Sequence, residues 1–322
     1  MRIFTADEIE ARLGYPMLID VLERAFRAGA IAPPRHHHTV KLAGRPDATL
    51  LLMPAWSTSE PNSATAGRYI GVKSVTVFPD AGKFGKPAVQ GAYLLLSTDT
   101  GEPLALMDAP RLTVWRTAAA SALAARHLAP EQASRMLMVG AGALAPYLVR
   151  AHASIRPIRE VAVWNRSPAG AARLARKLAA SGLAATAIDD LEAGVRNADL
   201  ISTATLAAEP LVRGAWLKPG THLDCVGAFT PAMRETDDEV VRRARIWVDT
   251  REGALREAGD LVQPIKAGVI EESRIEGDLY GLARGTAPRR GSDQEITMFK
   301  SVGASIEDLA AAIAVYERLS SE

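Results

Sequence analysis

A glycine-rich turn separates an apolar run from a helical stretch in the segment MLMVGAGALAPYLVRAH. A glycine at the first position permits a tight turn, a second lets the backbone approach a ligand, and a small third residue lets helix and strand pack closely. The backbone N–H groups at such a helix N-terminus bind phosphate. The spacing predicts a pyrophosphate cradle for a dinucleotide, made by Gly140, Gly142, Ala143, Leu144 and Ala145.

The second strand of this region ends in the residues Asn165, Arg166 and Ser167. A site for NAD usually has an acidic residue there for the ribose, whereas a site for NADP has an arginine for the 2′-phosphate. No carboxylate is present at this strand end, and the arginine suits a phosphate. We therefore expect NADP to be preferred over NAD.

Small and polar residues follow two later strands, at Thr203 and Thr205 and again at Val226 and Gly227. The carboxyl ends of parallel strands meet at one edge of a sheet, where the nicotinamide ribose lies in such folds. We expect these residues to contact the cofactor.

Two positively charged side chains are candidates for binding the substrate and for catalysis. Lys73 lies in the strand-like segment RYIGVKSVTVF, whose two faces are both mostly apolar. A buried ammonium is costly unless it is paired or deprotonated, so this lysine is a functional candidate. Arg116 lies in an alanine-rich helical segment, and its guanidinium fork has the shape that a carboxylate needs.

The elements that position these residues change character along the chain. The first third reads as an α+β unit, with a capping box from Thr5 to Glu8, a helix after Pro16, several strands and a hairpin at 99–101. From Thr113 the chain is helical to about residue 129 and then alternates strands and helices, which predicts an α/β fold with a Rossmann-type, doubly wound parallel sheet.

The last segment predicts a single amphipathic helix that packs on the first domain or across a dimer interface. Its start, Ser305-Ile306-Glu307-Asp308, has the pattern of an N-terminal cap. One face carries an apolar stripe: Ile306, Leu309, Ile313, Tyr316 and Leu319. We expect two domains, one of residues 1–112 and 296–322 and one of residues 113–295.

Composition limits the possible partners. The chain of 322 residues is 48% hydrophobic and 23% charged with a formal net charge of +1, which argues against disorder, nucleic-acid binding and electrostatic attachment to membranes. The acidic N-terminal segment does not resemble a signal peptide, the single Cys225 cannot form an internal disulfide, and no apolar run reaches the length of a membrane span. We expect a cytoplasmic enzyme with a small-molecule substrate.

The triplet His36-His37-His38 invites a metal interpretation. Consecutive strand residues point to opposite faces, so these three cannot converge on one ion. We expect no metal.

Five separated motifs resemble the ornithine cyclodeaminase / mu-crystallin family in order and spacing: GVKSVTVFP, GEPLALMDAPRLTVWRTAAASALAARHLA, VGAGALA, VGAFTPAMRE and DQEITMFKSVGASIEDLAAA. The resemblance implies a Rossmann domain, an N-terminal domain for substrate binding and homodimerisation, and NAD(P) between them. It places Lys73 in the substrate pocket, Arg116 and Arg35 on the substrate carboxylate, and Ser301 and Val302 in contact with cofactor and substrate.

One residue departs from the family pattern. Members that cyclise ornithine have an aspartate at the position of Phe229, where it is thought to activate the side-chain amine. The resemblance favours an oxidoreductase that transfers hydride at the α-carbon of an amino or imino acid, such as a ketimine or pyrroline-2-carboxylate reductase or an amino-acid dehydrogenase. The residues after the second strand add the preference for NADP. Ornithine cyclodeamination and a non-catalytic, NADP-loaded binding protein are the alternatives.

Overall fold

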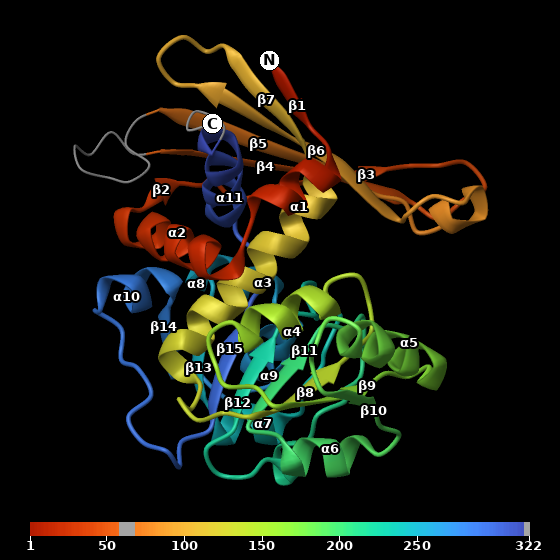
Figure 1. Ribbon diagram of the computed structural model, residues 1–322, viewed down its shortest axis with the longest axis vertical. Helices are drawn as coiled ribbons and strands as arrows, with labels where there is room; N and C mark the ends of the chain where they lie inside the picture. The colour runs from red at the N-terminus through yellow and green to blue at the C-terminus, as the bar shows by residue number, and fades with distance from the viewer. Residues whose placement is uncertain (58–67, 319–322) are drawn as a thin grey trace. The chain divides into compact units, whose positions relative to one another are not determined.

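The computed structural model describes residues 1–57 and 68–318, which form two units: residues 1–117 with the chain from residue 304 onward, and residues 118–303 (Figure 1). The boundaries expected from the sequence lay at 112/113 and 295/296. The later change of unit reflects β15 (Thr297–Lys300), which pairs with strands of the second unit. Which unit binds substrate and which mediates dimerisation stays a prediction.

The first unit is built on a seven-stranded sheet in the order β1-β7-β6-β5-β4-β2, with β3 paired to β4. Strand β1 is parallel to β7 and the other pairs are antiparallel. The strands are β1 (Arg2–Phe4), β2 (Ala30–Ile31), β3 (His36–Val40), β4 (Ala48–Ser57), β5 (Tyr69–Val77), β6 (Val89–Ser97) and β7 (Pro103–Asp108).

Local sequence explains the elements around this sheet. The predicted capping box is confirmed: the Thr5 hydroxyl accepts the Glu8 N–H, and the Glu8 carboxylate accepts the Thr5 N–H. The predicted hairpin between β6 and β7 is also confirmed. The unit's helices are α1 (Ala6–Arg12), α2 (Tyr15–Ala28) and α11 (Ser305–Glu317), with a short 3-10 turn at Ala81–Phe84.

Helix α3 (Ala109–Leu128) begins earlier than the sequence suggested. Strand β7 ends at Asp108, whose carboxylate accepts the N–H of Arg111, so the helix starts without an intervening loop. Arg116 consequently lies about two turns into the helix, instead of the single turn that a start at Thr113 gives. Residues 109–117 of α3 belong to the first unit.

Helix α11 packs against α2 and against β4, β5 and β6 of the first unit (Figure 1). Ile306, Leu309 and Ile313 are buried as expected, and Leu319 lies outside the described residues. The expected cap is wrong: the N-cap residue is Ala304, and no side chain caps the helix. The acidic side chains of its first turn are buried and used elsewhere, as shown below.

The second unit contains an all-parallel sheet of eight strands in the order β10-β9-β8-β11-β12-β15-β13-β14. The chain moves outward from β8 in one direction and then from β11 in the other, which makes β8 and β11 the switch point of a doubly wound fold. The strands are β8 (Arg135–Val139), β9 (Glu160–Trp164), β10 (Ala185–Ala187), β11 (Leu200–Thr203), β12 (His222–Cys225), β13 (Arg245–Val248), β14 (Ile275–Asp278) and β15.

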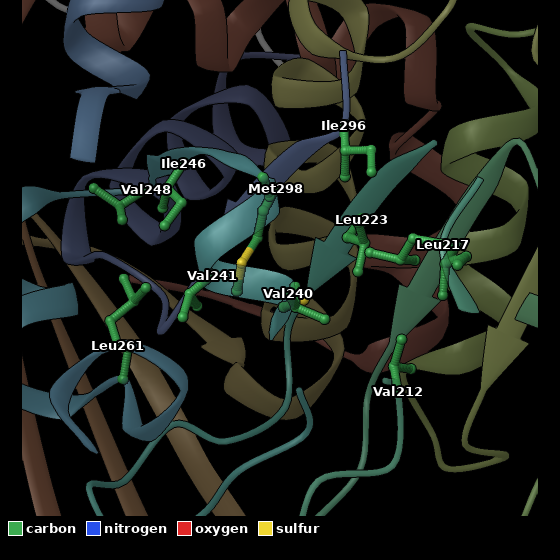
Figure 2. Packing of buried hydrophobic residues seen from close by; sticks show 14 of the residues in the cluster. Val212, Leu217, Leu223, Val240, Val241, Ile246, Val248, Leu261, Ile296 and Met298 are labelled. Atoms are coloured by element: carbon green, nitrogen blue, oxygen red, sulfur yellow. The ribbon is translucent and has the colours of Figure 1, made fainter. Parts of the chain in front are cut away.

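Helices and short 3-10 turns connect these strands. The helices are α4 (Ala145–Ala153), α5 (Pro168–Ala179), α6 (Leu191–Asn197), α7 (Asp238–Arg243), α8 (Arg251–Glu257), α9 (Gly259–Lys266) and α10 (Leu279–Arg284); the 3-10 turns are Gly214–Trp216 and Glu272–Arg274. Valine, leucine, isoleucine and methionine side chains from α7, α9 and the central strands form the core in Figure 2, among them Val240, Leu261, Ile246 and Met298. The predicted Rossmann-type sheet is confirmed. In residues 1–57 and 68–318, no helix has the length and apolar character needed to cross a membrane.

Candidate active site

The glycine-rich turn follows β8 at the switch point and leads into α4. Gly140 has a φ of 107°, and a Cβ there would lie 2.7 Å from the carbonyl oxygen of Ala204. Around Gly142 the space that a Cβ would occupy is open. Within the described chain, the N–H groups of Gly142, Ala143 and Leu144 donate to no protein acceptor. The turn therefore has the free donors and the space that a pyrophosphate needs, and the predicted cradle stays a prediction.

Asn165 has a structural task in this turn. Its Oδ1 accepts the N–H of Ala141 at 3.2 Å, and its Nδ2 donates to the carbonyl of Ser167 at 3.0 Å. Arg166 and Ser167 are exposed, and the Ser167 hydroxyl makes no cap bond to α5. In the described part of the chain Arg166 has no partner, so its guanidinium is available to a ligand.

The threonines after β11 are occupied by a buried carboxylate. Thr203 donates its hydroxyl to Glu235 Oε2 at 2.8 Å, while Thr205 donates its N–H and hydroxyl to Oε1 at 2.7 and 2.8 Å. These hydroxyls hold the strand end in shape. Any contact that they make with a ribose uses their remaining acceptor capacity or the adjacent backbone.

Lys300, at the end of β15, extends this network. Its Nζ lies 3.1 Å from Asp260 Oδ2 and donates to the carbonyl of Gly227. Burial raises the pKa of Glu235 to about 7, against the lowering effect of the Lys300 charge. Burial lowers the pKa of Lys300, but Asp260 and Glu235 outweigh that effect and raise it. Lys300 thus holds the loop after β12 in place through the Gly227 carbonyl.

The segment after β15 is fixed by Asp249. Its Oδ2 accepts the N–H groups of Val302 at 2.7 Å and Gly303 at 2.6 Å, and the Ser301 hydroxyl at 3.1 Å. The side chains of Ser301 and Val302 are buried. Their expected contacts with cofactor and substrate stay predictions.

The loop after β12 presents an aromatic side chain. Val226 is buried, whereas Phe229 is 43% exposed. The intervening Ala228 has a φ of 49°, an uncommon left-handed conformation for a residue with a Cβ. The Lys300 bond to Gly227 lies beside this strained residue and stabilises the loop that displays Phe229.

Lys73 lies on β5 in the first unit with an exposed fraction of 2%. Its Nζ lies 2.7 Å from Asp308 Oδ2 on α11 and 3.5 Å from the Thr113 hydroxyl. Burial lowers the pKa of Lys73 to about 8; Asp308 raises it, while the charges of Arg116 and Arg35 lower it. The predicted burial of this lysine is confirmed, and its pKa suits proton transfer near neutral pH.

Arg116 lies beside Lys73 and is held by two carboxylates. Its Nε donates to Asp308 Oδ1 at 3.0 Å and its Nη1 to Glu307 Oε2 at 2.6 Å. Both acidic side chains are fully buried. Nη2 has no partner in residues 1–57 and 68–318, so one terminal nitrogen remains for a substrate carboxylate.

Two further groups face this cluster. Tyr93 lies opposite Lys73 in the β5–β6 register, and its buried hydroxyl has no hydrogen-bond partner among the described residues. Burial and the nearby Asp308 charge raise the pKa of that hydroxyl. Arg35 is half-buried, and its charge acts on Lys73. The structure therefore brings three of the five sequence-predicted substrate residues, Lys73, Arg116 and Arg35, into one neighbourhood.

The sequence reasoning missed the buried acidic residues. Glu307 and Asp308 were interpreted as a helix cap, although two charges within an otherwise apolar helix were a signal of buried partners. Glu235, Asp260 and Lys300 gave no such signal, because only the sheet order brings their strands and helices together.

His36 and His38 lie on the same side of β3, with ring centroids 6.2 Å apart.

The doubly wound sheet, the glycine turn with free N–H groups and the lysine–arginine cluster define a Rossmann-type, dinucleotide-binding protein with a second α+β unit. A sequence model of the Ornithine cyclodeaminase/mu-crystallin family matches residues 2–322. The chain belongs to this family, as the sequence motifs suggested.

Proteins of similar sequence or structure include two Delta(1)-pyrroline-2-carboxylate reductases and an alanine dehydrogenase. The chain is 41% identical over 286 residues to a Delta(1)-pyrroline-2-carboxylate reductase of Paracoccus denitrificans, covering 88% of each protein. Its structure is similar to that of the Thermococcus litoralis Delta(1)-pyrroline-2-carboxylate reductase in complex with NADH and L-proline, with TM-score 0.91, 31% identity and coverage of 100% of this chain and 98% of that one. An archaeal alanine dehydrogenase dimer with bound NAD gives TM-score 0.89 at 30% identity, covering 100% and 96%.

Proposed function

We propose that this protein is an NAD(P)-dependent reductase of the C=N bond of α-imino acids, with a cyclic imine such as Δ1-pyrroline-2-carboxylate as substrate. The similar proteins that reduce this compound or bind NADH and L-proline support the assignment. The observation that carries it in this chain is the cluster of Lys73 and Arg116, a buried ammonium beside a guanidinium with one free terminal nitrogen.

The chain's own residues have separate tasks in this reaction. Arg116 binds the substrate carboxylate through Nη2, and Arg35 adds a second positive charge. Lys73 donates a proton to the imine nitrogen, because its pKa of about 8 leaves it protonated at neutral pH yet able to lose the proton. The nicotinamide, when bound, supplies the hydride that reduces the α-carbon.

The dinucleotide is held by the second unit. The N–H groups of Gly142, Ala143 and Leu144 bind the pyrophosphate, and Arg166 binds a 2′-phosphate, which makes NADPH the preferred reductant. The proposed cofactor site also includes Thr203, Thr205, Val226, Gly227 and Ser301. Phe229 and Val302 contribute apolar surface to the substrate. A homodimer is part of the proposal, supported by the alanine dehydrogenase dimer.

The test is reduction of Δ1-pyrroline-2-carboxylate by purified protein, followed by the absorbance of the reduced cofactor and by proline formation. We expect one proline to form for each reduced cofactor that is oxidised, over many turnovers. Tight cofactor binding without turnover of any imino acid in a panel would instead favour a non-catalytic binding protein.

A further inference from the structure

Asp308 connects the two cations of the substrate cluster. One carboxylate oxygen, Oδ2, lies 2.7 Å from Nζ of Lys73, and the other, Oδ1, accepts the Nε–H of Arg116 at 3.0 Å. The Asp308 side chain has no exposed surface, and that of Lys73 is 3% exposed. Water therefore screens this ion pair weakly, and a change in the charge of Asp308 acts strongly on the lysine.

The preceding residue gives a natural comparison. Glu307 lies on the same turn of α11, is equally buried, and binds Nη1 of Arg116. Lys73, in contrast, pairs with Asp308 and contacts Thr113, and it makes no pair with Glu307 in the described part of the chain. The two neighbouring carboxylates thus share the arginine but not the lysine.

The charges around Lys73 are unequal in sign. Burial, Arg116 on α3 and Arg35 before β3 all lower its pKa, and Asp308 on α11 is the group that raises it. Tyr93, which faces Lys73 from β6, is neutral because its own pKa is raised. Without the Asp308 charge, burial, Arg116 and Arg35 all favour a neutral amine.

We propose that Asp308 is a positioning residue that keeps Lys73 protonated and fixes its Nζ beside Arg116, so that a substrate anchored by its carboxylate meets a proton donor at its nitrogen. This role rests on the proposed imine reduction. Glu307 orients the arginine through its bond to Nη1.

The reaction balances with this assignment. The imine carbon gains a hydride from the reduced nicotinamide and becomes a C–H carbon, while the π pair of the C=N bond takes the proton of Lys73 and forms the N–H bond. Lys73 is left as a neutral amine with its lone pair. A proton from water then restores the ammonium beside Asp308.

A purely structural ion pair makes a different prediction. Loss of a buried partner then lowers stability and activity at every pH, because the pair holds the fold and nothing else. The proposed role instead links Asp308 to the pH at which activity is lost. The dependence of kcat/KM on pH therefore separates the two.

The experiment compares Asp308→Asn with the matched variant Glu307→Gln. Each change removes the charge of one buried carboxylate that binds Arg116 and keeps an oxygen that can accept the arginine N–H. We expect the alkaline limb of kcat/KM for imine reduction to move to lower pH by roughly 1 to 3 units in Asp308→Asn, with activity retained at acid pH. Glu307→Gln should raise KM through the arginine and leave the limb where it lies in the unmodified protein.

A second measurement does not need turnover. The pKa of Lys73 is read from an NMR titration of protein with labelled lysine side chains, with Lys73→Met used to identify its signal. We expect a value near 8 that matches the alkaline limb of the unmodified enzyme, and a lower value in Asp308→Asn. Equal limbs in the two variants, or a Lys73 pKa that Asp308→Asn leaves unchanged, would overturn the proposal. The predicted NMR shift without turnover would contradict the proposed function and leave the role of Asp308 in place.

Discussion

Lys300 and Asp260 form an ion pair, with 3.1 Å between Nζ and Oδ2, in which neither side chain has any exposed surface. Burying two such charges costs free energy that only good geometry and further hydrogen bonds return. Asp260 Oδ1 has those bonds, since it accepts the N–H groups of Glu235 and Thr236 and the Thr236 hydroxyl. Lys300 has the Gly227 carbonyl.

We therefore expect Lys300→Met to lower the free energy of unfolding by about 3 to 5 kcal/mol, because it leaves Asp260 as an uncompensated buried charge. Urea denaturation measures the loss. Adding Asp260→Asn should recover part of it, since the amide keeps the Oδ1 acceptor and removes the unpaired charge. Equal stabilities of the single and the double variant would refute this account.

Arg166→Ala should weaken NADPH binding selectively. The guanidinium is free to form a charge-assisted hydrogen bond with a 2′-phosphate, and losing that bond costs about 1.5 to 3 kcal/mol, or roughly ten- to hundred-fold in Kd. Binding of NADH should change little. Arg176→Ala, at an exposed position at the other end of α5, is the control. The unmodified protein should also show a higher kcat/KM with NADPH than with NADH, and the opposite order would contradict the predicted preference.

Lys73→Met should abolish turnover and leave cofactor affinity nearly intact, because the lysine lies in the first unit and the phosphate cradle in the second. Steady-state kinetics and a fluorescence titration with NADPH measure the two effects. A loss of cofactor affinity as large as the loss of activity would show that the lysine acts on the dinucleotide.

Arg116→Lys should lower kcat/KM for the imino acid by at least about tenfold. An ammonium keeps the charge but does not reproduce a planar fork that binds Asp308, Glu307 and a substrate carboxylate at once. Product inhibition by proline gives an independent measure of carboxylate binding. An unchanged inhibition constant in this variant would be incompatible with the assigned role.

Ornithine should not be cyclised to an appreciable extent. Its δ-amine has a pKa near that of lysine, about 10.4, and must lose a proton before it attacks the imine. A carboxylate accepts that proton, whereas the exposed ring of Phe229 cannot. Ammonia and proline are assayed after incubation with ornithine and catalytic NADP. Δ1-Pyrroline-2-carboxylate with stoichiometric NADPH is the positive control for proline formation. Release of both products over many turnovers would disprove the prediction.

The sequence was most informative where chemistry depends on local spacing. The glycine turn, the alternating strands and the buried Lys73 were predictable because each follows from neighbouring residues or from the two-residue period of a strand. The partners of Lys73 were not, since Asp308 is 235 positions away and reaches the lysine only through the packing of α11 on β5. The same holds for Glu235, whose threonine partners come from another strand end.

The position of β15 has a consequence for how the chain folds. This strand lies between β12 and β13 in the second sheet, yet it is the last of the eight to leave the ribosome. Helix α11, which packs on β4, β5 and β6 of the first sheet, directly follows β15 in the chain. Both units therefore wait for residues 297–317 of the nascent chain, and earlier intermediates expose an open strand edge and an uncovered apolar face. Such intermediates depend on contacts of high sequence separation, which makes folding slow and favours aggregation, so chaperone supply during synthesis should limit the yield of this protein.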